Sequence, residues 1–178
     1  MVGDLADEAA VSRYYDGLED LWASIQIAGA YAGAPIGRSD KSVLMNQLES
    51  NLISAYVCSR AAVASMRKRK KGGGRIVNVA ARQALEPRLG AGSVAYTISK
   101  AGVAALTTSL GAELAGEGIL VNAVAPSIMD TAANRKGMPD ADFASWPKVE
   151  EVAATILFLA SPENVVTRGA VVPVYGKA

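Results

Sequence analysis

The residue pair best suited to chemistry in this 178-residue chain is Tyr96 and Lys100, four positions apart in a segment with helical spacing. Residues four apart share one face of a helix, so the phenol and the ammonium can approach one point. A nearby cation stabilises a phenolate, and a tyrosine with a lowered pKa can donate a proton to a carbonyl or remove one from an alcohol. This spacing is common in helices, so the assignment depends on its surroundings.

Histidine is absent and cysteine nearly so, which limits the kinds of catalytic and metal sites that this chain can form. The sequence has no histidine, and Cys58 is its only cysteine. Ser-His-Asp and Cys-His catalysis, the usual zinc sites and an internal disulfide are thereby excluded. Cys58 lies in an apolar stretch, and we expect it in the core. Proton transfer near neutral pH must then use Tyr, Lys, Asp, Glu or water.

The composition is that of one folded domain, which we expect to span residues 1–178. Hydrophobic residues make up 51% and charged residues 20%, and the net charge of +1 gives no reason to expect a nucleic-acid or membrane partner. No apolar run reaches the roughly 18 residues of a membrane span, and the acidic N-terminus has no signal peptide. We therefore expect a cytoplasmic protein. The basic run 67–71 is interpreted as a solvated helix end.

Apolar strand-like runs alternate with helical patterns along the chain. We expect helices over 5–15, 40–70, 93–116 and 148–160, and strands over 20–27, 75–80, 119–125 and 170–175. Ser93 is expected to cap its helix. The strand runs hardly alternate between polar and apolar residues, which is typical of strands buried on both faces. The sequence therefore predicts an α/β fold with a Rossmann-like parallel sheet and helices on both faces.

These surroundings support the Tyr96–Lys100 pair. The strand RIVNVA, a Gly-rich loop and the stretch AYTISKAGVAALTTSLGAELAGEGILVNAVAPSIMDT resemble, in this order, the catalytic part of the short-chain dehydrogenase/reductase family. Residues 27–30 stand where that family has an Asn-Asn-Ala-Gly turn. Within the family, residues 27–34 and 130–146 resemble the quinonoid dihydropteridine reductases and their bacterial relatives.

The resemblance implies an NAD(P)-dependent oxidoreductase with a small-molecule substrate and no metal, and it does not distinguish NAD from NADP. It makes Tyr96 the general acid, Lys100 the group that lowers the pKa of Tyr96 and binds the nicotinamide ribose, and Asn51 the support of a proton-relay water. It implies a homodimer or homotetramer through the helices 40–70 and 93–116. The further cofactor-binding residues that it implies are Asp4 and Leu5 at the adenine, and Ala28, Gly29, Pro126, Ser127, Ile128 and Thr131.

The chain departs from the family pattern at the substrate. Ala80 and Ala81 stand where the family usually has two serines, the second of which binds the substrate carbonyl. The dihydropteridine reductases also lack that serine. We therefore expect a pteridine-like or other conjugated substrate instead of an ordinary ketone.

A second departure concerns the cofactor phosphates. The family begins with a βαβ segment whose Gly-rich turn and helix N-terminus hold the pyrophosphate, and this sequence shows no counterpart, because Gly72-Gly73-Gly74 precedes a strand. We expect a truncated Rossmann-like sheet, with residues 2–5 as the tail of a strand. The run 20–27 would then lie at an edge, which invites pairing with a second copy, cover by the N-terminal helix or further chain upstream.

Two other functions are compatible with these residues. The chain can be a non-catalytic partner that associates with a full-length relative. It can also be an isomerase or lyase that uses Tyr96 and Lys100 without nicotinamide.

Overall fold

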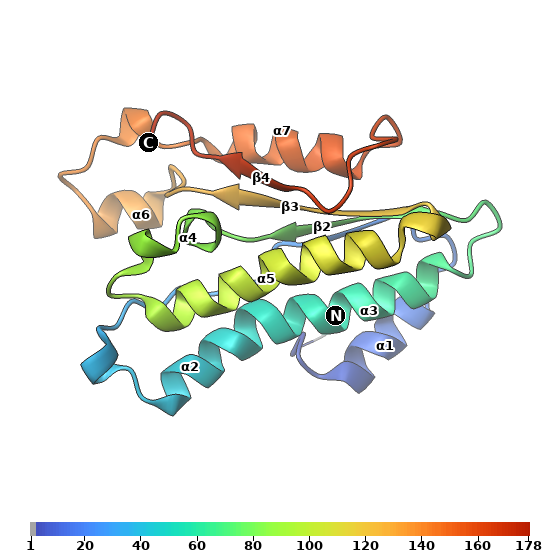
Figure 1. Ribbon diagram of the computed structural model, residues 1–178, viewed down its shortest axis with the longest axis horizontal. Coiled ribbons are helices and arrows are strands. Elements are labelled where there is room, and N and C mark those ends of the chain that lie inside the picture. The colour runs from blue at the N-terminus through green and yellow to red at the C-terminus, as the bar shows by residue number, and fades with distance from the viewer. Residues whose placement is uncertain (1–2) are drawn as a thin grey trace.

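A computed structural model describes residues 3–178 as three layers, with a sheet between two layers of helices (Figure 1). All strand pairs are parallel, and the strand order is β1-β2-β3-β4. The predicted α/β fold with a parallel sheet is confirmed. The strands are β1 (Ala23–Gln26), β2 (Gly74–Val79), β3 (Ile119–Pro126) and β4 (Val171–Val174).

Helices α3 and α5 cover one face of the sheet and α7 covers the other (Figure 1). Successive strand residues point to opposite faces. Ile76 of β2 therefore packs with Met66 on the α3 side, while Val77 packs with Ile156 of α7. No described helix is long and apolar enough to cross a membrane. The helices are α1 (Glu8–Asp16), α2 (Lys41–Gln47), α3 (Ser54–Met66), α4 (Arg82–Leu85), α5 (Val94–Glu113), α6 (Ala132–Gly137) and α7 (Val149–Ala160).

The single helix predicted over 40–70 is wrong in two respects, because a π-helical segment, η2 (Leu48–Ile53), separates α2 from α3, and α3 ends at Met66. Hydroxyl groups explain the interruption. Ser50 donates to the carbonyl of Asn46, and Ser54 donates to the carbonyl of Ser50. Such side-chain bonds compete with the regular helix pattern and bend helices. Short π-helical segments are frequent at functional sites.

The N-terminal residues differ from the prediction. Residues 3–6 form a bend and a turn and no strand, and Val2 lies outside the described residues. Helix α1 begins at Glu8 because the carboxylate of Asp7 accepts from the Ala10 N–H and caps it. This helix packs on α3 and does not pair with β1. Among the described strands β1 is hydrogen-bonded only to β2, so one edge of the sheet is free.

The basic run 67–71 is more ordered than a solvated helix end. Three of its five side chains pair with carboxylates from other elements, which joins the end of α3 to α1, to the chain before β1 and to the turn after α5. The pairs of Arg67 and Lys68 are exposed and contribute little individually, whereas the Arg69 side chain is 6% exposed. The pairs are Arg67–Glu117, Lys68–Asp16 and Arg69–Asp20.

A close contact of α5 with the chain before β4 gives a stability test. A Cβ at Gly111 would lie 2.8 Å from the Gly169 nitrogen and 3.2 Å from the Val121 carbonyl oxygen. Because both are backbone atoms, we expect Gly111→Ala to lower the free energy of unfolding by about 1–3 kcal/mol in urea titrations. The control is Gly116→Ala, where nothing lies within 4 Å. Equal stabilities of the two variants would contradict the contact.

Candidate active site

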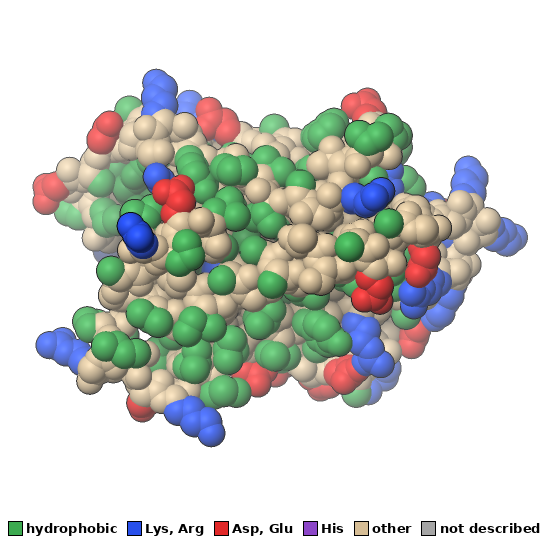
Figure 2. All heavy atoms as spheres, in the orientation of Figure 1, with side chains coloured by type: hydrophobic (Ala, Val, Ile, Leu, Met, Phe, Trp, Pro, Cys, Tyr) green, Lys and Arg blue, Asp and Glu red, His purple; other side chains and the backbone are tan. Residues whose placement is uncertain are grey.

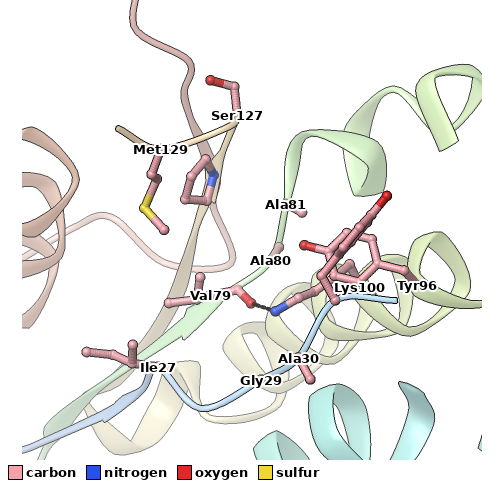
Figure 3. A pocket seen from close by; sticks show the side chains of 12 residues that line it. Ile27, Gly29, Ala30, Val79, Ala80, Ala81, Tyr96, Lys100, Ser127 and Met129 are labelled. Carbon is pink, nitrogen blue, oxygen red and sulfur yellow. Dashed lines mark hydrogen bonds between the residues drawn. The ribbon is translucent and has the colours of Figure 1, made fainter. Parts of the chain in front are cut away.

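A cavity of about 220 Å³ opens at the carboxyl ends of β1, β2 and β3 (Figure 3). Ligands of open parallel sheets bind outside these strand ends. The cavity contains five of the residues predicted from the sequence: Gly29, Tyr96, Lys100, Pro126 and Ser127. Its other lining residues are Ile27, Ala30, Tyr31, Val79, Ala80, Ala81 and Met129.

Lys100 lies in the second turn of α5 and is only 6% exposed. Its ammonium group donates to the carbonyl oxygen of Val79, the last residue of β2, at 2.7 Å (Figure 3). Burial penalises the charged form and lowers the pKa of Lys100 to about 8. Lys100 therefore changes its charge close to physiological pH.

Tyr96 lies one helical turn before Lys100 and lines the same cavity. Burial raises the pKa of Tyr96 to about 12, and the neighbouring phenol of Tyr31 adds to the rise. The sequence predicted a lowered pKa, and in this structure that direction is wrong. The reason is burial, which raises the pKa and is not offset by Lys100, whose ammonium binds the Val79 carbonyl. Tyr96 is therefore a protonated donor at neutral pH.

Asn51 is 1% exposed and clamps the loop after β1. Its side-chain oxygen accepts from the Ala30 N–H at 2.9 Å, and its Nδ2 donates to the Ala30 carbonyl at 2.9 Å. The same Nδ2 donates to Ser99 Oγ at 3.1 Å, and that hydroxyl donates to the carbonyl of Tyr96 at 2.7 Å. Asn51 thus joins the loop, η2 and the start of α5. Its predicted support of a proton-relay water stays a prediction.

Five residues predicted for cofactor binding do not line this cavity. Ala28 lies between two lining residues, and Ile128 is 43% exposed beside the lining residue Met129. The Thr131 hydroxyl accepts from the Asn134 N–H and caps α6.

The remaining two of these five lie near α1. The Asp4 carboxylate accepts from the Ala6 N–H, and Leu5 packs on a cluster with Val11 and Cys58. Both residues are thus engaged with the α1 and α3 side of the fold. Cys58 is buried there as expected.

The wall opposite the phenols has no hydroxyl of its own. Ala80 and Ala81 are 2% and 4% exposed and face the cavity where serines would stand. Ser93 does not replace them, because its Oγ donates to the Gly90 carbonyl. For the same reason the predicted capping bond of Ser93 is wrong, although Ser93 does occupy the N-cap position of α5.

Besides the lining residues Ile27, Ala30 and Val79, sequence reasoning missed Tyr31, Met129 and Ser99. Tyr31 and Met129 line the cavity, and Ser99 connects Asn51 with Tyr96. The signals were present but weak. Tyr31 is an aromatic residue directly after the small residues 28–30, and Ser99 precedes the lysine of the pair.

Three comparisons relate the sequence and fold of this chain to known proteins. The family model described as short chain dehydrogenase matches residues 1–142. The chain is 35% identical over 188 residues to galactitol 2-dehydrogenase of Rhizobium johnstonii, covering 97% of this chain and 72% of that protein. It is 33% identical over 187 residues to cis-4-hydroxycyclohexanecarboxylate dehydrogenase of Sinomonas cyclohexanicum, covering 97% and 73%. The structure of ElxO with NADP bound superposes with a TM-score of 0.86 at 25% identity, covering 97% and 75%.

The buried lysine predicts a pH dependence of stability. The pKa of Lys100 falls from 10.5 to about 8 on folding, so between these values the unfolded chain binds more protons than the folded one. Stability from this group therefore rises with pH in that window. From pH 7.5 to 10, we expect the unfolding free energy of the wild type to gain roughly 2–3 kcal/mol relative to Lys100→Met in urea titrations. Parallel pH profiles of the two proteins would show that Lys100 is not desolvated.

Proposed function

The chain belongs to the short-chain dehydrogenase family, and from this we propose that it reduces a small conjugated substrate with NADH or NADPH, using Tyr96 as the proton donor. One observation carries the proposal. Tyr96 and Lys100 converge on a single cavity at the carboxyl edge of a parallel sheet. Acid–base groups with shifted pKa values in a cleft are candidates for catalysis.

The cavity fits the nicotinamide and ribose end of the cofactor. Its volume of about 220 Å³ suits part of a ligand, because sites for whole drug-sized ligands measure about 300–1,000 Å³. A Cβ at Gly29 would lie 2.5 Å from Asn51 Oδ1 and 3.3 Å from Lys100 Nζ, so only glycine keeps this wall open. Lys100 has two further ammonium protons for ribose hydroxyls. When bound, the nicotinamide supplies the hydride.

The proton chemistry follows from burial. Tyr96 keeps its proton at neutral pH and donates it to the substrate oxygen or nitrogen that gains charge during reduction. The phenolate left on Tyr96 is stabilised by the ammonium of Lys100, four residues further along the same helix face. Below about pH 8 Lys100 carries that charge, so reduction is supported in the neutral range.

The substrate class follows from the wall at Ala80 and Ala81. Without a hydroxyl at these positions, an aliphatic carbonyl lacks a second hydrogen bond that would polarise it. A quinonoid ring is more electrophilic and can be reduced without this second hydrogen bond. The resemblance of residues 27–34 and 130–146 to dihydropteridine reductases supports the same choice. We include a pteridine-like or other conjugated substrate in the proposal.

An oligomer through α2, α3 and α5 is also part of the proposal. Figure 2 shows hydrophobic side chains gathered over this side of the molecule. Exposed apolar side chains on these helices and on η2 are Met45, Ile53, Tyr56, Val94 and Ile98. Sedimentation velocity is expected to show a dimer or tetramer that Tyr56→Glu weakens, and a monomer at micromolar concentration would contradict the interface.

The proton-donor assignment is tested with Tyr96→Phe. We expect this variant to bind NADH or NADPH like the wild type in calorimetry, with a dissociation constant below about 1 mM. Reduction of quinonoid dihydropterin is expected to slow by roughly 10²–10⁴, because general acid catalysis is lost. Full activity of the variant would refute the assignment. No heat of binding with either cofactor would refute the proposed cofactor site in the wild type.

A further inference from the structure

Two phenol hydroxyls are among the polar groups of the residues that line the cavity. Its polar side chains are Tyr31, Tyr96, Lys100 and Ser127. Ser127 Oγ donates to the Tyr175 carbonyl, and Lys100 donates to the Val79 carbonyl. Within residues 3–178, neither phenol has a hydrogen-bond partner. Both hydroxyls are therefore free to bind a ligand, whereas the catalytic scheme uses one.

The two rings form one aromatic corner. Their centroids are 4.9 Å apart and their planes are inclined by 78°, an edge-to-face arrangement. Tyr31 is 66% exposed, so most of its surface is available to a ligand. The backbone next to Tyr31 is held in place, because the side chain of Asn51 binds both the N–H and the carbonyl of Ala30.

Gly33 sets the position of the Tyr31 hydroxyl. A Cβ built at Gly33 would lie 2.7 Å from the Tyr31 oxygen and 3.3 Å from the ring carbon that carries it. The phenol thus folds back over the glycine two residues later. Any side chain at position 33 would therefore displace the Tyr31 ring. The three atoms nearest to such a Cβ all belong to the Tyr31 side chain and none to the backbone.

The corner faces an apolar wall. Ala80, Ala81 and Met129 offer a ligand no hydrogen bond from their side chains. A flat conjugated ring suits such a site, since it can pack on a phenol ring and accept a hydrogen bond at its edge. A flexible aliphatic carbonyl gains only the hydrogen bond.

We propose that Tyr31 determines substrate specificity by providing a stacking surface and a second hydroxyl for planar conjugated heterocycles, in place of the hydroxyl missing at Ala80 and Ala81. The inference deepens the proposed function, since it names the residue that selects the substrate class. It concerns binding, so it can be tested without turnover. Tyr31 is not a proton donor in this scheme.

The first test measures binding of oxidised pterin through its fluorescence, with cyclohexanone as a non-aromatic competitor. Tyr31→Leu removes the ring and is expected to weaken pterin binding about tenfold, while Tyr31→Phe removes only the hydroxyl and weakens it roughly threefold to tenfold. Tyr14→Leu, an exposed tyrosine on α1 that does not line the cavity, is the matched control and should bind like the wild type. Equal affinity of the wild type and Tyr31→Leu, or no pterin binding at all, would overturn the proposal.

A second variant moves Tyr31 without replacing it. Gly33→Ala is expected to reproduce most of the loss seen in Tyr31→Leu, whereas Gly37→Ala, where nothing lies within 4 Å, should bind pterin normally. Wild-type affinity of Gly33→Ala would contradict the role of the Tyr31 position.

Calorimetry with NADPH separates this proposal from the proposed function. Loss of pterin binding in the Tyr31 and Gly33 variants with unchanged NADPH binding supports Tyr31 as the specificity residue. In active enzyme, Tyr31→Leu should raise KM for quinonoid dihydropterin about tenfold and change kcat by less than about threefold. A wild type that binds pterin but no cofactor would refute the proposed function and leave the pterin site standing.

Discussion

The side chain of Asn51 joins two of the segments that line the cavity, the loop after β1 and the start of α5. One primary amide offers two donors and an acceptor oxygen. Here the oxygen and the nitrogen bind both polar groups of Ala30, and the nitrogen also reaches Ser99, which in turn binds the carbonyl of Tyr96. With Asn51 almost completely buried, a lost partner would cost about 1–3 kcal/mol. The walls at Gly29 and Tyr96 therefore keep a fixed separation.

Burial shifts the pKa values of the two ionisable groups of the site in opposite directions. A low-dielectric environment penalises charge, so Lys100 releases its proton more easily and Tyr96 holds its proton more firmly. Both groups are thus biased towards their neutral forms until charge develops in the cavity. A negative charge on the tyrosine oxygen then favours the protonated lysine. The arrangement suits proton donation during a reduction better than proton removal from a resting alcohol.

The sequence was sufficient for the sheet and for the centre of the site. Continuous apolar runs identify β2 and β3, since strands buried on both faces need no polar positions. Tyr96 and Lys100 could be paired because helical spacing is local. The pKa of Tyr96 could not be predicted, because it depends on burial in a cavity that segments distant in sequence create.

The same distinction explains the errors along the chain. The side chain of Asn51, in the π-helical segment, binds a loop that lies 21 residues earlier in sequence, and no local pattern marks this contact. Thr131 was expected at the cofactor, but its hydroxyl caps its own helix α6. Tyr31 became visible as a site residue only when the fold brought its ring against Tyr96. Contacts between distant segments decided the cases of Asn51 and Tyr31, whereas Thr131 is engaged by a local bond at the start of α6.

The two buried cations at opposite ends of β2 differ in how many of their hydrogen-bond donors the protein binds. Arg75, at the amino end, is 6% exposed, and its guanidinium donates to the carbonyls of Gly74, Ser161 and Asn164 while stacking on Trp22. Backbone carbonyls of the protein thus bind the donors of this guanidinium. Lys100, at the carboxyl end, donates one ammonium proton to the Val79 carbonyl. Its other two ammonium protons have no carbonyl acceptor among the described residues. At equal burial, Arg75 is thus tied to the surrounding backbone by several bonds, whereas Lys100 keeps donors for a ligand.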